Sequence, residues 1–188
     1  MSPFEYVIVL ISIILGLGIA LVLTGIAELI KRWKSCTHFW PYLIWILVVF
    51  VLHIQEWWAT YDLRSVKSWS LLIFLFVILY PILLFVLSNL LFPSKWPKKG
   101  IDIKEFYFNN CKKFFVCIVL FAILSIVQNV VIANYRLQDQ LIQFSVLLIF
   151  TIMILRPTRS ITIHTSLSLV MLIMMLIGLF LTKDLSEI

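Results

Sequence analysis

Hydrophobic residues form six long blocks along this chain, and the short connections between them hold most of the charged residues. The blocks cover approximately residues 6–30, 39–60, 69–92, 112–134, 139–155 and 160–182. A helix rises about 1.5 Å per residue, so about 20 apolar residues cross the ~30 Å hydrocarbon layer of a bilayer. The fifth block is the shortest. The pattern therefore predicts an all-α polytopic membrane protein with six transmembrane helices.

Composition supports a membrane environment and leaves little material for a soluble domain. The mean hydropathy is +1.10, and only 13% of the 188 residues are charged, against about 25% in soluble globular proteins. No Lys or Arg precedes the first block, which is also longer than the apolar core of a signal peptide, so it is expected to remain as a transmembrane helix. We therefore expect residues 1–188 to form a single transmembrane helical domain.

The basic residues are distributed unevenly between the two sides of the predicted membrane domain. Eleven of the fifteen Lys and Arg residues lie in the connections after the first, third and fifth blocks, and four lie on the side of the termini. Because cytoplasmic loops carry the excess of Lys and Arg, both termini are predicted to be extracytoplasmic in a bacterial inner membrane. The net charge of +6 mostly reflects this bias, so no direct nucleic acid binding is expected.

The longest connection, residues 93–113, combines helix breakers, lysines and aromatic residues. We expect it to lie along the cytoplasmic membrane surface, where each basic residue adds about 1 kcal/mol of attraction to anionic lipid. A docking site for a cytoplasmic protein or an anionic ligand is the alternative. The candidate contact residues for lipid or partner are Lys95, Lys98, Lys99 and Lys104.

Ionisable residues are rare inside the predicted spans, which makes the second span informative. His53 and Glu56 lie one helical turn apart in the stretch HIQEWWATYDLR. Ser125, Gln128 and Asn129 share a face of the fourth span at a similar predicted depth, within reach of hydrogen bonds to His53 or Glu56. This intramembrane polar cluster has three interpretations: a structural network at a wet interface, a proton-coupled or ligand-binding site, and a catalytic site.

The first span carries a repeat of small and polar residues at every fourth position. The repeat consists of Ser12, Gly16, Ala20, Thr24 and Glu28, while Gly18 and Gly25 lie on a second face. Small residues let helix backbones approach closely, which favours a helix-packing face within or between subunits. The alternative is a narrow water path in a homo-oligomer. Lys31 and Arg32 lie three and four residues after Glu28, so a surface ion pair also explains this glutamate.

Catalytic and cofactor motifs are missing from the sequence. One His and one Glu give too few ligands for a metal, and His38 and His164 fall elsewhere in the predicted topology. No phosphate-binding loop and no HExxH or GxSxG motif occurs. We therefore expect no cofactor, no metal and no enzymatic activity, and His53 with Glu56 would be the acid/base pair of a lipid enzyme if one existed.

Two segments carry a resemblance to known proteins. SPFEYVIVLISIILGLGIA and HIQEWWATYDLR, followed by WSLLIFLFVILYPILL, resemble a group of uncharacterised small multi-pass bacterial inner-membrane proteins. In size and in its lack of soluble domains the chain is more loosely similar to membrane effectors of anti-phage systems, some of which form oligomeric channels. That similarity implies a gated pore and antiviral defence, and it assigns no residue roles.

The sequence therefore favours a homo-oligomeric, channel-like or pore-forming membrane protein, with the lipid bilayer and further copies of itself as partners. The main alternative is a non-conducting membrane anchor or regulatory subunit of a partner complex. A small-solute carrier and a lipid enzyme follow.

Overall fold

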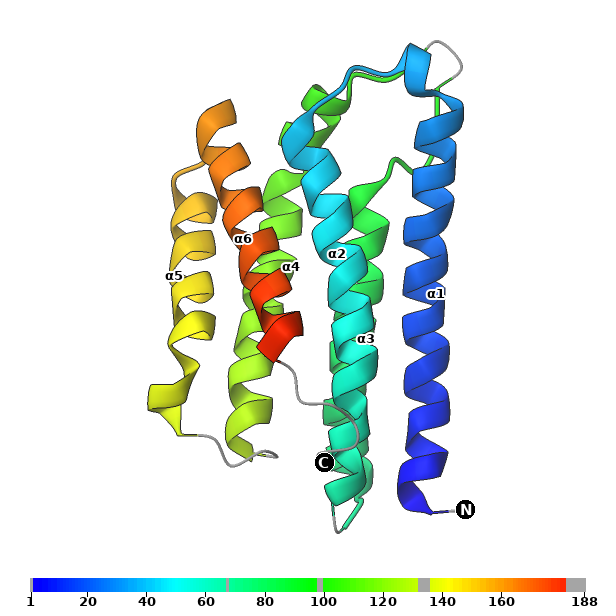
Figure 1. Ribbon diagram of the computed structural model, residues 1–188, viewed down its shortest axis with the longest axis vertical. Coiled ribbons are helices and arrows are strands. Elements are labelled where there is room, and N and C mark those ends of the chain that lie inside the picture. The colour runs from blue at the N-terminus through cyan, green and yellow to red at the C-terminus, as the bar shows by residue number, and fades with distance from the viewer. Residues whose placement is uncertain (1, 67, 98–99, 132–135, 182–188) are drawn as a thin grey trace.

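The computed structural model shows an all-helical chain and describes residues 2–66, 68–97, 100–131 and 136–181 (Figure 1). The α-helices are α1 (Pro3–Lys31), α2 (Trp40–Ala59), α3 (Leu71–Leu91), α4 (Ile103–Val131), α5 (Leu141–Leu155) and α6 (Ile161–Leu181). Three short 3₁₀ helices accompany them: η1 (Trp33–Ser35), η2 (Thr60–Ser65) and η3 (Leu137–Gln140). The six predicted blocks thus correspond to six α-helices.

Five of these helices are long and apolar enough to cross a membrane. They are α1, α2 with η2, α3, α4 and α6, whereas α5 has only 15 residues. At about 1.5 Å per residue, α5 is about 22 Å long, which is shorter than the ~30 Å hydrocarbon layer. The chain is therefore a polytopic helical membrane protein in which the fifth helix is too short to span alone unless the bilayer is thinned around it.

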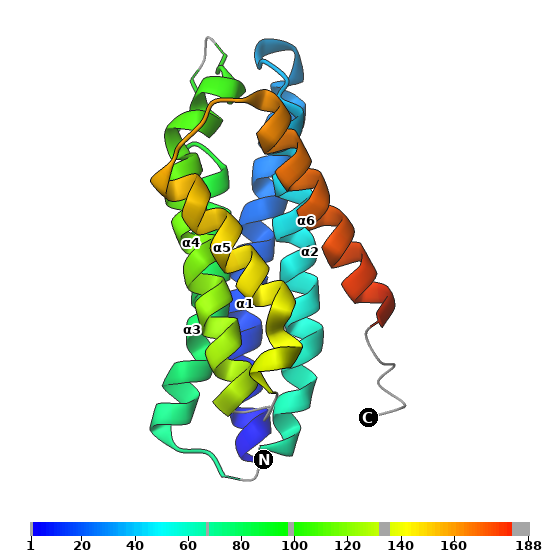
Figure 2. The same ribbon diagram turned by 90° about the vertical axis from the view of Figure 1, so that its left-hand side faces the viewer.

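The helices run up and down the bundle, so the connections after α1, α3 and α5 meet at one end (Figures 1 and 2). We call this the basic end, because it holds Lys31, Arg32, Lys95, Arg156 and Arg159. Along the bundle α1 packs mainly on α3, α5 packs on α4, and α6 packs on α2. The α2–α6 pair and the α4–α5 pair therefore face one another, and Figure 2 shows the C-terminal end of α6 standing away from the bundle.

The second small-residue face of α1 makes the tight contacts with α2 and α3. Gly18 and Gly25 are both buried, together with Ile11, Leu15 and Val22 on the same side of the helix. A Cβ at Gly18 would meet the His53 imidazole, and a Cβ at Gly25 would meet the Phe92 ring. Glycine is thus required at both positions for close approach of the helices.

Three large aromatic side chains join α2, α4 and α5 in the core. The ring centroids of Phe115 and Phe150 are 5.1 Å apart, and Trp45 lies 5.9 Å from Phe150 and 6.3 Å from Phe115. All three side chains are almost fully buried. Tilted and edge-to-face packing of this kind adds stability beyond the burial of apolar area.

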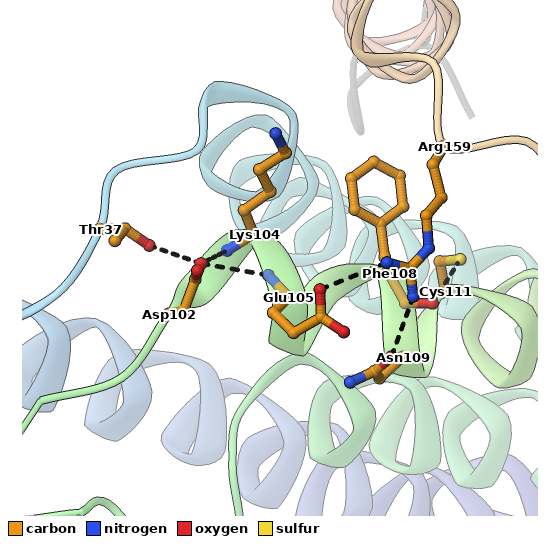
Figure 3. Close-up of polar contacts among 8 residues, drawn as sticks. All are labelled: Thr37, Asp102, Lys104, Glu105, Phe108, Asn109, Cys111 and Arg159. Atoms are coloured by element: carbon orange, nitrogen blue, oxygen red, sulfur yellow. Dashed lines mark hydrogen bonds and ion pairs between the residues drawn. The ribbon is translucent and has the colours of Figure 1, made fainter.

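The fourth helix begins nine residues before the predicted span at 112–134. Asp102 caps it: Oδ1 accepts hydrogen bonds from the amides of Lys104 and Glu105 at 3.0 and 3.2 Å and from the Thr37 hydroxyl at 2.9 Å (Figure 3). Ile103 is fully buried in the first turn. The connection predicted at 93–113 therefore ends at Asp102, because this cap and the buried apolar face start a helix at residue 103, and its expected place along the membrane surface stays a prediction.

The shorter connection that remains, residues 92–102, is fixed to the α1–α2 connection. Arg32 donates to the carbonyl of Pro97 at 3.3 Å, and Cys36 forms a β-bridge with Ile101. Gly100 has φ of +92°, and a Cβ there would also meet the carbonyl oxygen of Ser35. Both the left-handed backbone and the close approach require glycine at this turn.

Candidate functional site

A large apolar cleft lies between the α2–α6 pair and the α4–α5 pair, next to the aromatic contact of Trp45 with Phe115 and Phe150. Its volume is about 360 Å³, within the roughly 300–1,000 Å³ that is usual for small-molecule sites. Met171, Met174 and Met175 line it from α6, opposite Phe121 and Ala122 of α4. Methionine side chains are flexible and polarisable, so they adapt to apolar ligands of different shape.

The cleft is long and partly open to the outside of the bundle. Along α4 it extends from Phe114 to Ser125, which corresponds to about 16 Å of helix. This is close to half of the ~30 Å hydrocarbon layer, the length of an acyl chain in one leaflet. Ile142 of α5 lines the cleft and is 62% exposed, so the opening lies beside α5.

Two glutamines interrupt the apolar lining. Gln55 of α2 donates from Nε2 to the backbone carbonyl of Met175 at 3.0 Å, which ties α2 to α6 on one wall of the cleft. Gln143 of α5 has a buried Oε1 that accepts no hydrogen bond from the described part of the chain. Buried amide oxygens are normally hydrogen-bonded, so Gln143 is an acceptor that a bound molecule would satisfy.

A second, polar cavity adjoins the cleft at the end of the bundle opposite the basic end. Its volume is about 120 Å³, enough for several water molecules at about 10–15 Å³ each. Glu56 lines it from α2, Thr60 from η2, Tyr80 from α3, and Gln128 from α4. Ser125 lines both spaces, so the polar cavity begins where the apolar cleft ends.

The carboxylate of Glu56 dominates the chemistry of the polar cavity. No Lys, Arg or His is among the described lining residues, and no hydrogen-bond partner of this carboxylate occurs in the described ranges. A carboxylate at membrane depth costs about 2.5–3.5 kcal/mol on insertion scales unless a partner or water compensates it. The Oε1 atom of Gln128 is likewise buried without a partner, so the cavity is rich in unsatisfied acceptors.

The structure thus brings four of the five cluster residues, Glu56, Ser125, Gln128 and Asn129, around one cavity. His53 lies elsewhere, fully buried, with Nδ1 donating to the Val49 carbonyl at 2.7 Å and Nε2 3.3 Å from the Ser88 hydroxyl. His53 therefore does not contribute to the polar cavity and cannot form an acid/base pair with Glu56 there.

The small-residue repeat of α1 points away from the bundle. Gly16, Ala20 and Thr24 are exposed, and a Cβ added at Gly16 would have no neighbour within 4 Å. Ser12 is half-buried and lines a separate groove with Trp57 and Trp58. The face is therefore available to lipid or to another subunit.

Glu28, the last member of the repeat, forms ion pairs at 2.9 Å with Lys31 and at 3.3 Å with Arg32. This is the surface ion pair that the sequence suggested. Its carboxylate is thus partnered by two cations, in contrast to Glu56.

The lysines of the predicted lipid or partner contact do not form one surface loop. Lys95 is exposed in the connection before α4, and Lys104 is exposed in the first turn of α4. Lys98 and Lys99 lie outside the described residues. Nearby, Arg159 contacts Glu105 at 3.4 Å and Asn109 at 3.5 Å (Figure 3).

No family model, curated protein or solved structure matches this chain. The geometry and chemistry of the two adjoining spaces are therefore the basis for a proposed function. Within the described residues, no group of three His, Cys, Asp or Glu side chains is arranged to hold a metal.

Several lining residues were not identified from the sequence. Tyr80 is hidden in an apolar run beside Pro81, and Gln55 points away from the His53 face. The segment MLIMML in α6 could have indicated the apolar cleft, because methionine-rich faces are common at adaptable apolar binding surfaces.

Proposed function

We propose that this chain is a membrane protein that binds a single-chain amphiphile taken up sideways from the bilayer. The apolar chain fills the cleft between the α2–α6 and α4–α5 pairs, and the head group enters the polar cavity beside Ser125. The distribution of basic residues further supports a bacterial inner-membrane location, with both termini outside the cytoplasm.

The observation that carries this proposal is the junction of the two spaces at Ser125. An apolar cleft about as long as one leaflet's acyl chain adjoins a cavity lined by a carboxylate, amides and hydroxyls. An apolar surface followed by a polar surface along the helices matches an amphiphile that lies parallel to the helix axes.

An apolar occupant would complete the packing of the cleft. The cleft of about 360 Å³ is lined mostly by apolar side chains and is partly open beside α5. A chain that enters it gains van der Waals contacts with these side chains, which an unfilled space would forfeit.

Filling the cleft with a side chain tests the proposal. Met174→Trp places a large ring on the lining face of α6, whereas Ile177→Trp is the matched control on the outward face of the same helix, where Ile177 is 52% exposed. Native mass spectrometry of protein in nanodiscs would count bound tetradecylamine. We expect the amine to bind the wild type and Ile177→Trp but not Met174→Trp, and equal binding to all three would refute the proposal.

A channel-like homo-oligomer is the second candidate, favoured by the exposed small-residue face of α1 at Gly16, Ala20 and Thr24. Any pore of this kind would form between subunits. A non-conducting anchor for a partner complex would use the same face, and a role in antiviral defence stays a prediction. Oligomer mass in detergent, followed by conductance in planar bilayers, separates these functions.

A further inference from the structure

We propose that the polar cavity selects an amphiphile whose head group is a protonated amine, with the Glu56 carboxylate as its counter-ion. This inference rests on the proposed function, because the head group reaches the cavity only when its chain occupies the cleft. It names the class of ligand: a long-chain primary amine drawn from the bilayer.

Charge complementarity is the first reason. Glu56 exposes its carboxylate to a cavity without a described cation, while Glu28 of α1 has two basic partners. A ligand that brings its own positive charge replaces the missing partner. A phosphate or carboxylate head group would instead face Glu56 with like charge.

Hydrogen-bond capacity is the second reason. An ammonium group has three donors and no acceptor. The residues that line the cavity carry several acceptors: the Glu56 carboxylate, the hydroxyl oxygens of Ser125 and Tyr80, and the amide oxygen of Gln128, which is buried without a partner in the described part of the chain. An alcohol head group has only one donor and would leave more of these acceptors without a hydrogen bond than an ammonium group does.

The size of the cavity is the third reason. A space of about 120 Å³ holds several waters and so also holds an ammonium group with one or two waters. A free metal ion is disfavoured because Glu56 is the only carboxylate in the described lining, whereas calcium takes six to eight oxygen ligands.

The test compares tetradecylamine with tetradecanol, which differ only in the head group, by native mass spectrometry in phosphatidylcholine nanodiscs. The wild type should prefer the amine by at least tenfold, as one charge-assisted hydrogen bond provides. Glu56→Gln should lose that preference and keep its affinity for the alcohol within twofold. Glu28→Gln is the matched control and should behave as the wild type.

The outcomes separate the two proposals. Binding of both probes without preference in the wild type overturns the amine assignment and leaves the cleft as an amphiphile site. Failure of both probes to bind the wild type overturns both. Propylamine, which has the head group without the chain, should not compete with tetradecylamine, and effective competition would show that the amine binds without the cleft. Because the wild-type comparison needs no variant, the test survives misfolding of Glu56→Gln.

Discussion

The packing of α1 predicts opposite effects of alanine at two glycines only two residues apart. At Gly18 the added Cβ meets the His53 imidazole, with its Cδ2 at 2.8 Å, whereas at Gly16 no atom lies within 4 Å. The imidazole cannot move aside cheaply, because Nδ1 is held by the Val49 carbonyl at 2.7 Å and Nε2 lies against Ser88. Gly18→Ala therefore forces α1 away from α2.

The size of the effect is estimated from the difference in free energy of unfolding between Gly16→Ala and Gly18→Ala. Both substitutions gain the same helix propensity, up to about 1 kcal/mol relative to glycine, so this contribution cancels in the comparison. Overpacking of a tight interior costs about 1–3 kcal/mol. We expect the free energy of unfolding of Gly18→Ala to be lower than that of Gly16→Ala by about 1–3 kcal/mol.

Equilibrium unfolding in mixed micelles, with sodium dodecyl sulfate as the denaturant, measures this difference. In a His53→Ala background the clash is removed, so Gly18→Ala should cost little, and the double-mutant cycle should give a coupling energy of similar size. Equal stability of Gly16→Ala and Gly18→Ala would refute the assignment of the buried face of α1.

Three other predictions concern the basic end and the outer surface. Hydrogen bonds from the Glu105 amide, and next from the Thr37 hydroxyl, lower the pKa of Asp102. The cap of α4 therefore contributes its full stability above the ordinary value of about 3.9, and this contribution is lost as pH falls through the lowered pKa of the folded protein. Exchange of the Lys104 and Glu105 amides should accelerate over that range, and Asp102→Asn should remove this pH dependence. Arg159→Ala should change the free energy of unfolding by less than about 1 kcal/mol in thermal denaturation, because its ion pair with Glu105 is exposed; a larger loss would show that the contact is buried in the membrane-bound protein. If copies associate through the exposed face of α1, Ala20→Trp should lower the oligomer mass measured by light scattering. Leu120→Trp, at an exposed position on α4, is the control and should leave the mass unchanged. An unaltered mass in both variants would exclude the α1 face as the contact between copies.

The helices could be predicted from the sequence because hydrophobic length is a local property. The start of α4 could not, because Pro93, Pro97 and Gly100 indicated a loop while the cap at Asp102 depends on Thr37, distant in sequence. Which face of α1 is buried was also undetermined. Both faces contain small residues, and only the positions of His53 and Phe92 show that Gly18 and Gly25 pack inward.

The polar residues show the same division between local and non-local information. Glu56 on α2 and Gln128 and Asn129 on α4 were predicted to lie near one another because they have similar depths in their spans, and all three line one cavity. His53 was assigned to the same group, but its contact with Ser88 of α3 depends on how three helices pack. The apolar cleft depends on the pairing of α6 with α2 and of α5 with α4, which no periodicity in the sequence specifies.

Photo-crosslinking maps the occupant of the cleft directly. A diazirine-bearing tetradecylamine would be bound to the protein in nanodiscs, irradiated, and located by peptide mass spectrometry. Binding in the cleft predicts adducts on Met171, Met174 and Gln143, which line it. Adducts spread over outward residues such as Ile173 and Ile177, with none in the cleft, would contradict it.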